Sequence, residues 1–283
     1  MGFVKRRGNT KSKVGVEQFE ALKTQYLLDI KATVEMMEIP PELVINWDQT
    51  GIKIVPVSSW TMEKRGAKRV EIAGVDDKRQ ITAVFVATAV GEFLPIQLIY
   101  QGKTAASLPA FTFPDDWSVT YTPNRWANEE TTKMYIEKII VPFVKEKRRQ
   151  LHLEDDHPAL VIFDVFKGQC TEDVLKMLED NHIERVVVPA NCTDRLQPLD
   201  LSVNKPAKEF LGRKFQEWFA DQIAAQLEDS TQRVNAQQVD MRLSIMKPLG
   251  ARWLVQLYDY LCSNPSFIVN GFSAAGILDT LQQ

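Results

Sequence analysis

The chain has 283 residues, of which 45% are hydrophobic and 25% are charged, a composition typical of a globular protein with a sizeable core rather than a disordered chain. The formal net charge is −3, so any basic surface for nucleic acid must be local rather than global. The three cysteines are odd in number, far apart and not in a Cys-x-x-Cys pair, so neither a disulfide framework nor a zinc cage is indicated, and a reducing compartment fits. Because no run approaches the roughly 18 apolar residues of a membrane span and residues 1–20 lack a secretory signal, an intracellular protein is expected.

The first 40 residues predict a basic end followed by a helix. Residues 4–13 are basic and polar, a pattern that fits a nuclear-import signal, a contact with the DNA backbone or a solvated chain end. From Val16 to Met37 apolar residues recur at helical spacing, and Pro40-Pro41 ends the helix.

Strand patterns follow, at residues 43–48, 52–57, 81–90 and 93–100. The first of these runs ends in Asp48, and Gln49-Thr50-Gly51 is predicted to turn into the second. Gly91-Glu92 separates the last two runs as a hairpin turn. Antiparallel strands are therefore expected early in the chain.

The second half of the chain predicts alternating helices and strands. Residues 103–128 look irregular, and a long helix at 129–149 then crosses over to a buried strand at 159–164, which ends in Asp164. The remaining predicted elements are a helix, a strand, a helix and a mostly helical tail with an apolar stripe that we interpret as core, at residues 171–180, 183–189, 203–227 and 243–281. Together these elements predict a mixed sheet flanked by helices.

Acidic residues follow the strands at positions suited to chemistry. Asp48 and Asp164 each end a predicted strand, and the carboxyl ends of adjacent strands are where a sheet brings side chains together. Asp200 follows a strand and a loop, and Asp194 in the same loop is the alternative third acid. Converging carboxylates repel one another unless a cation neutralises them, and such oxygen ligands suit Mg²⁺ or Mn²⁺. Two such ions can support an in-line phosphodiester displacement. Turn capping is the structural alternative for Asp48 and Asp164.

Three segments together resemble the acid motifs of the pogo and Tigger-type transposases, which belong to the mariner superfamily and are related to centromere protein B. They are residues 46–51 (Asn-Trp-Asp-Gln-Thr-Gly), 161–169 (Val-Ile-Phe-Asp-Val-Phe-Lys-Gly-Gln) and 196–200 (Leu-Gln-Pro-Leu-Asp). The 35 residues between Asp164 and Asp200 also resemble the spacing in that family. The resemblance extends over nearly the whole chain.

This resemblance implies an α/β, RNase H-like fold, in which antiparallel hairpin strands come first and parallel strands follow, flanked by helices. It implies a DDE-type transposase or endonuclease domain in which Asp48, Asp164 and Asp200 hold two Mg²⁺ or Mn²⁺ ions and the chain cuts and joins DNA. The implied partners are transposon ends, target DNA and a second copy of the chain, and the implied location is the nucleus.

The expected organisation has three parts. Residues 1–40 are the basic end and helix that remain from the segment following a helix-turn-helix DNA-binding domain, 41–227 are the catalytic domain, and 228–283 are a C-terminal helical extension. Two other functions stay open: a domesticated protein that keeps the fold for DNA binding or dimerisation without catalysis, and an RNase H-type nuclease that acts on RNA in a hybrid.

Basic side chains are predicted to contact DNA phosphates in two places, between early strands and near the acids. They are Lys64, Arg65, Lys68, Arg69, Lys167, Arg195 and Lys205. A solvated hairpin is the alternative interpretation of the first group.

Overall fold

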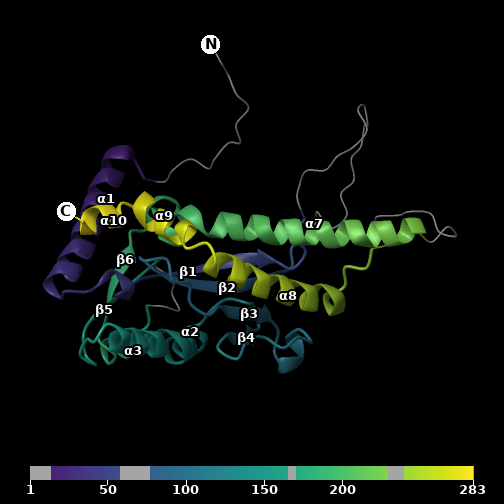
Figure 1. Ribbon diagram of the computed structural model, residues 1–283, viewed down its shortest axis with the longest axis horizontal. Helices are drawn as coiled ribbons and strands as arrows, with labels where there is room; N and C mark the ends of the chain where they lie inside the picture. Colours follow the sequence, from purple (N-terminus) through teal and green to yellow (C-terminus); the bar gives the residue numbers. More distant parts are fainter. Residues whose placement is uncertain (1–13, 58–76, 165–169, 229–238, 283) are drawn as a thin grey trace, which may run out of the picture.

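The computed structural model describes residues 14–57, 77–164, 170–228 and 239–282, and within them a six-stranded sheet forms the centre of the molecule (Figure 1). Its strands are β1 (Val44–Lys53), β2 (Gln80–Thr88), β3 (Gln97–Gln101), β4 (Ser118–Thr122), β5 (Ala159–Asp164) and β6 (Ile183–Val188), in the order β4-β3-β2-β1-β5-β6. β1, β2 and β3 pair antiparallel, whereas β1, β5 and β6 pair parallel. The predicted mixed sheet, antiparallel first and parallel afterwards, is confirmed.

Helices cover both faces of this sheet. They are α1 (Val16–Met36), α2 (Glu129–Tyr135), α3 (Val141–Gln150), α4 (Glu172–Glu179), α5 (Thr193–Leu196), α6 (Pro198–Ser202), α7 (Asn204–Glu228), α8 (Leu243–Cys262), α9 (Ser266–Ala274) and α10 (Ile277–Leu281). Trp47 of β1 packs against Tyr135 of α2, with ring centroids 5.7 Å apart, while the preceding Asn46 bonds to Gln197 next to α6. Since successive side chains of a strand face opposite ways, α2 and α6 cover opposite faces of the sheet.

The predicted turn at Gln49-Thr50-Gly51 is wrong, because β1 continues through it to Lys53. These three residues pair in register with β2, opposite Val84, Ala83 and Thr82. The ladder of backbone hydrogen bonds to β2 therefore overrides the local turn tendency. The predicted second strand at 52–57 is also wrong, because only residues 52 and 53 are extended, as the end of β1, and residues 54–57 belong to no strand. As a result Asp48 lies in the middle of a strand instead of at its end.

Two further local predictions needed correction in the following segment. Pro95, which has no N–H to give to a ladder, interrupts the predicted strand at 93–100, so that Phe93 makes only an isolated bridge to Ala87 and β3 begins at Gln97. Residues 103–128, predicted to be irregular, contain β4, which lies parallel to β3. The turn at Gly91 is as expected, with a φ of +94° that favours glycine.

The predicted long helix at 129–149 is present as α2 and α3, joined by a π-helical turn at Ile136–Ile140. Helices at the end of the chain belong to the same hydrophobic core as the sheet. The predicted stripe is buried there, at Trp253, Leu254, Leu257 and Leu261 of α8. Within the described part of the chain no helix is long and apolar enough to cross a membrane.

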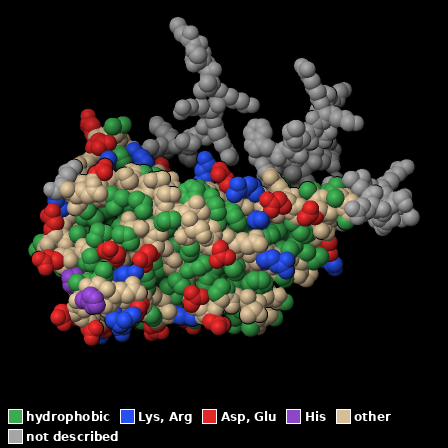
Figure 2. All heavy atoms as spheres, viewed as in Figure 1, with side chains coloured by type: hydrophobic (Ala, Val, Ile, Leu, Met, Phe, Trp, Pro, Cys, Tyr) green, Lys and Arg blue, Asp and Glu red, His purple; other side chains and the backbone are tan. Residues whose placement is uncertain are grey.

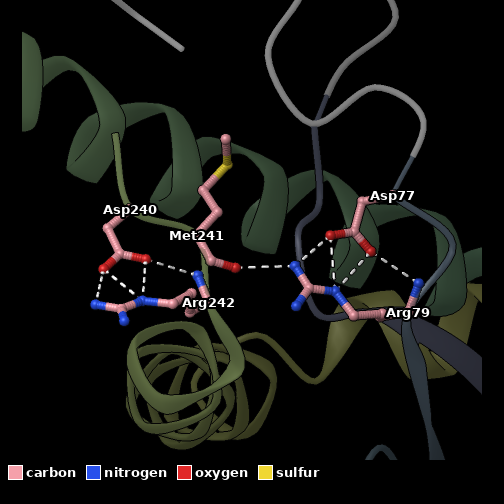
Figure 3. Close-up of polar contacts among 5 residues, drawn as sticks. All are labelled: Asp77, Arg79, Asp240, Met241 and Arg242. Carbon is pink, nitrogen blue, oxygen red and sulfur yellow. Dashed lines mark hydrogen bonds and ion pairs between the residues drawn. The ribbon is translucent and has the colours of Figure 1, made fainter. Parts of the chain in front are cut away.

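A single guanidinium joins the start of β2 to the segment that leads into α8 (Figure 3). Arg79 Nε donates to both carboxylate oxygens of Asp77, at 3.0 and 2.9 Å, and Arg79 Nη2 donates to the carbonyl of Met241 at 2.8 Å. Arg242 pairs in the same manner with Asp240. The chain is thereby fixed against the sheet at residues 240–242.

Candidate functional site

The structure brings the three predicted acids to one region. Asp48 lies in β1, Asp164 is the last residue of β5, and Asp200 lies in the first turn of α6. β1 and β5 are parallel neighbours whose register pairs Trp47 with Phe163. Asp48 and Asp164 are the next residues on each strand, and neighbouring strands are only about 4.8 Å apart. These two aspartates therefore lie side by side.

A buried amide network fixes the segment that carries Asp200 against β1. Asn46 Nδ2 donates to the carbonyl of Ile162 at 2.9 Å and to Gln197 Oε1 at 3.0 Å. Asn46 Oδ1 accepts from the backbone N–H of Leu199 at 3.1 Å, and Gln197 Nε2 donates to the carbonyl of Trp47 at 3.1 Å. Because Asn46 and Gln197 are fully buried, these bonds set the position of α6 relative to the sheet.

Side chains that flank α6 hold the carboxylates directly. The Asn204 amide, at the start of α7, donates from Nδ2 to Asp48 Oδ2 at 2.6 Å and to Asp200 Oδ1 at 2.5 Å. Thr193 Oγ1 of α5 donates to Asp164 Oδ2 at 2.7 Å. Asp48 and Asp200 thus share one amide. The distance between Asp48 Oδ2 and Asp200 Oδ1 therefore cannot exceed the sum of the two hydrogen-bond lengths.

Burial and mutual repulsion disfavour the charged forms of two of these acids. Burial raises the pKa of Asp48 to about 7, the charge of Asp200 adds to this rise, and hydrogen bonds from Asn204 and Gln197 oppose it. The pKa of Asp200 is also raised by burial, with Asp164 contributing repulsion, while Asn204 and Lys208 oppose the rise. Because burial and mutual repulsion disfavour the charged forms of Asp48 and Asp200, a cation bound between them would stabilise the ionised site.

The metal-free protein is expected to lose stability through Asp48 as the pH rises from about 4 to 7. An unfolded Asp titrates near a pKa of about 3.9, so across this interval the folded state binds more protons than the unfolded state, and the free energy of unfolding falls with rising pH. Urea denaturation in EDTA at several pH values should show Asp48→Asn gaining stability relative to the parent over this interval. A difference that does not change with pH would contradict the raised pKa.

The acids as they stand do not form a closed metal cage. Among the described residues, no three His, Cys, Asp or Glu side chains gather closely enough to hold a metal ion. The donors nevertheless fit Mg²⁺ or Mn²⁺ in kind, because carboxylate oxygens are the preferred ligands of these ions. Asp194, the alternative third acid, is exposed and lies 4.0 Å from Arg195, so Asp200 is the acid that faces Asp48.

The basic residues predicted to contact DNA have different positions. The guanidinium of Arg195 stacks on Phe19 of α1, 3.6 Å from the ring centroid. Lys205 is largely exposed at the start of α7, 3.8 Å from Glu209. Five others lie outside the described residues: Lys64, Arg65, Lys68, Arg69 and Lys167.

An open groove of about 1050 Å³ begins at Asp200 and Asn204 and runs along α7. Three basic side chains, Lys205, Lys208 and Arg213, are among the residues that line it, together with Glu209 and several apolar side chains. Figure 2 shows Lys and Arg side chains along the edge of the molecule where α7 runs, interspersed with acidic side chains. The groove thus connects Asp200 to a surface that carries three basic side chains.

Sequence reasoning missed the residues that support the acids, namely Asn204, Thr193, Asn46 and Gln197. A signal was present for Asn204, which follows Asp200 by four residues, the spacing that places side chains on the same face of a helix. For Thr193 no such signal exists, because its contact with Asp164 depends on how the α5 loop returns to the sheet.

The fold and the converging carboxylates define an α/β protein with an acidic site at the middle of its sheet, the class expected from the sequence. The family model described as "DDE superfamily endonuclease" matches residues 78–262. Because that match covers more than half of the chain, the chain belongs to the DDE superfamily endonuclease family. Asp164 and Asp200 fall within the match, whereas Asp48 precedes it.

Curated relatives include pogo transposable element proteins. "Pogo transposable element with KRAB domain" from Homo sapiens is 25% identical over 174 residues, which are 61% of this chain and 27% of that protein. "Pogo transposable element with ZNF domain" from Homo sapiens is 19% identical over 249 residues, 88% of this chain and 16% of the relative. The chain therefore spans about a quarter or less of the length of these relatives.

Solved structures show the same fold. The pre-cleavage Mos1 transpososome matches with a TM-score of 0.53 and 11% identity, covering 94% of this chain and 68% of that chain. The Mos1 mariner paired end complex with Mn matches with a TM-score of 0.52, at the same identity and coverage. The predicted resemblance to pogo and mariner transposases and the RNase H-like fold class are both confirmed.

Proposed function

We propose that this chain is the catalytic domain of a transposase that cuts and joins DNA by two-metal phosphodiester chemistry. Asp48, Asp164 and Asp200 are assigned to hold the divalent cations, Mg²⁺ or Mn²⁺. Transposon ends and target DNA are the assigned substrates, and the nucleus, where such DNA lies, is the expected location.

One observation carries this proposal: Asp48 and Asp200 share a single amide beside Asp164, at the carboxyl end of β5. Two carboxylates that share one amide, with a third close enough to repel one of them, are unfavourable unless a cation neutralises them. The raised pKa values of Asp48 and Asp200 agree with a site adapted to bind positive charge. A purely structural cluster would gain nothing from this repulsion.

The residues of the chain have separable tasks in this proposal. Bound divalent cations supply activation of a water or a DNA 3′-hydroxyl and stabilisation of the leaving oxygen. The aspartates must give up their protons for a cation to bind, which makes binding depend on pH. Lys205, Lys208 and Arg213, which line the groove that begins at Asp200, are assigned to hold the phosphates of a DNA strand.

The proposal is tested by nicking of supercoiled duplex DNA by the full chain with Mg²⁺ or Mn²⁺. The parent is expected to nick, and Asp164→Asn to lose activity by a factor on the order of 10³ or more, because the loss of a metal ligand removes several kcal/mol of transition-state stabilisation. Asp194→Asn is the matched control, since it removes an exposed acid near the site and should leave nicking unchanged.

Other outcomes would redirect the assignment. Loss of nicking in Asp194→Asn but not in Asp200→Asn would assign the role of third metal-binding acid to Asp194. Cleavage of RNA in a hybrid without cleavage of DNA would favour the RNase H-type alternative. If the unaltered chain binds no Mn²⁺ in a calorimetric titration, the enzymatic proposal is contradicted. A domesticated protein that binds DNA or dimerises without catalysis would then be favoured.

A further inference from the structure

Asn204 is the residue on which the arrangement of the acids depends. Only 4% of its surface is exposed, and its Nδ2 lies between two carboxylates at 2.6 and 2.5 Å. Both N–H bonds of the amide are therefore used. In the metal-free protein this dipole reduces the repulsion between Asp48 and Asp200 and keeps their oxygens close together.

The other end of the same amide is unsatisfied. Asn204 Oδ1 is buried and has no hydrogen-bond partner among the described residues. A buried carbonyl oxygen without a partner is uncommon and costs free energy, so its presence beside an acidic site calls for a physical reason. A ligand that the oxygen would contact in another state of the site is such a reason.

A cation between Asp48 and Asp200 would reverse which end of the Asn204 amide is favoured next to the two carboxylates. The N–H₂ group would then point its positive end at a positive ion, whereas the carbonyl oxygen is a ligand that Mg²⁺ and Mn²⁺ accept. The two ends of an Asn amide are nearly equal in size, so the group can turn over within the same space. Adjacent oxygens of an octahedral Mg²⁺ site lie about 3 Å apart, a few tenths of an ångström more than the present contacts.

We propose, on the basis of the metal site assigned above to Asp48 and Asp200, that Asn204 has two roles that exchange when metal binds. In the metal-free protein its Nδ2 holds the two carboxylates together. When a divalent cation enters, the amide turns over and Oδ1 becomes an additional ligand. The structure thus assigns to α7, through its first residue, a direct part in the metal site.

Mn²⁺ alone, titrated into the full chain and followed by the electron paramagnetic resonance signal of the free ion, tests this proposal. Asn204→Ala is expected to raise the Kd for Mn²⁺ by about 10-fold to 100-fold, the range found when metal-site partners are removed. Asn204→Asp, which keeps an oxygen at the same place, should bind Mn²⁺ at least as tightly as the parent. Asn264→Ala is the matched control, because among the described residues the Asn264 side chain donates to the carbonyl of Tyr260, away from the acids.

Binding of Mn²⁺ by Asn204→Ala as tightly as by the parent, or more tightly, would overturn the proposal, since the amide would then only compete with the cation. If the parent itself binds no Mn²⁺, the assigned metal site fails and this inference fails with it. A measurement on the unaltered chain covers the case in which the variants do not fold. The Asn204 side-chain N–H₂ resonances of protein labelled with ¹⁵N-asparagine should lose their protection from exchange when Mg²⁺ binds, and unchanged protection would contradict the turnover.

Discussion

Replacement of Arg148 by Met is expected to lower the free energy of unfolding by about 3 kcal/mol, because a buried polar group left without its hydrogen-bond partner costs about 1–3 kcal/mol and several carbonyls lose their donor. Arg148 near the end of α3 is only 2% exposed. Its guanidinium donates to the carbonyls of His157 and Asp155, at 2.6 and 2.8 Å, and to those of Asn181 and His182, both at 3.1 Å. These carbonyls belong to the loops that precede β5 and β6, so a single side chain joins α3 to the two parallel strands.

Met fills much of the volume of the Arg stem but leaves these buried carbonyls without donors, and each unpaired acceptor adds to the loss. Thermal unfolding should show a drop in Tm on the order of 5–15 °C. Arg149→Met is the matched control, because the neighbouring Arg149 is exposed and, within the part of the chain that the structure describes, its charge pairs with Glu146 three residues away. That variant should change stability by less than about 0.5 kcal/mol. Equal effects of the two substitutions would contradict the role given to Arg148.

Gly271→Ala is expected to disrupt the acid site from a distance. A Cβ at Gly271 in α9 would lie 2.3 Å from the carbonyl oxygen of Pro198 and 2.3 Å from Ser202 Oγ. Both residues belong to α6, and the contact with Pro198 is with backbone, so the two helices must separate. Because α6 carries Asp200, the separation moves this acid away from Asn204.

Overpacking of this kind typically costs about 1–3 kcal/mol, and a displacement of about 1 Å in an active site can reduce the rate on the order of 10²-fold. We therefore expect Gly271→Ala to remain largely folded in thermal unfolding but to lose Mn²⁺ affinity and DNA nicking. Gly250→Ala is the control, since Gly250 in α8 has no heavy atom within 4 Å of the added Cβ and should gain about 0.5–1 kcal/mol of stability. Full nicking by Gly271→Ala would show that α6 tolerates the displacement.

The sequence predicted the buried parallel strands well because they are continuous apolar runs. The run at 159–164 corresponds to β5 at both ends. The turn at residues 49–51 was wrongly predicted because the signals of Gln, Thr and Gly are local, whereas pairing with β2 depends on residues some thirty positions later. β4 was missed for a related reason: only five residues long, it is stabilised by its parallel partner β3.

The three acids of the candidate site could be predicted from the sequence, but the polar residues that hold them in place could not. Each acid follows or ends an apolar run, and this pattern places Asp48, Asp164 and Asp200 near one another once the strands pair. The contact of Thr193 with Asp164 and the network between Asn46 and Gln197 join segments more than 20 and 150 residues apart, respectively. Polar contacts of this kind leave no periodic signal, since a buried amide and an exposed one look alike in a sequence.

The close approach of α9 to α6 also sets an order of events during synthesis. All three aspartates leave the ribosome before Ser266–Ala274, the helix against which α6 packs. A nascent chain therefore carries the acids before it can hold Asp200 in place. The nuclease activity proposed above should consequently be withheld until translation has passed α9, and products of incomplete translation would contain the acids without their arrangement.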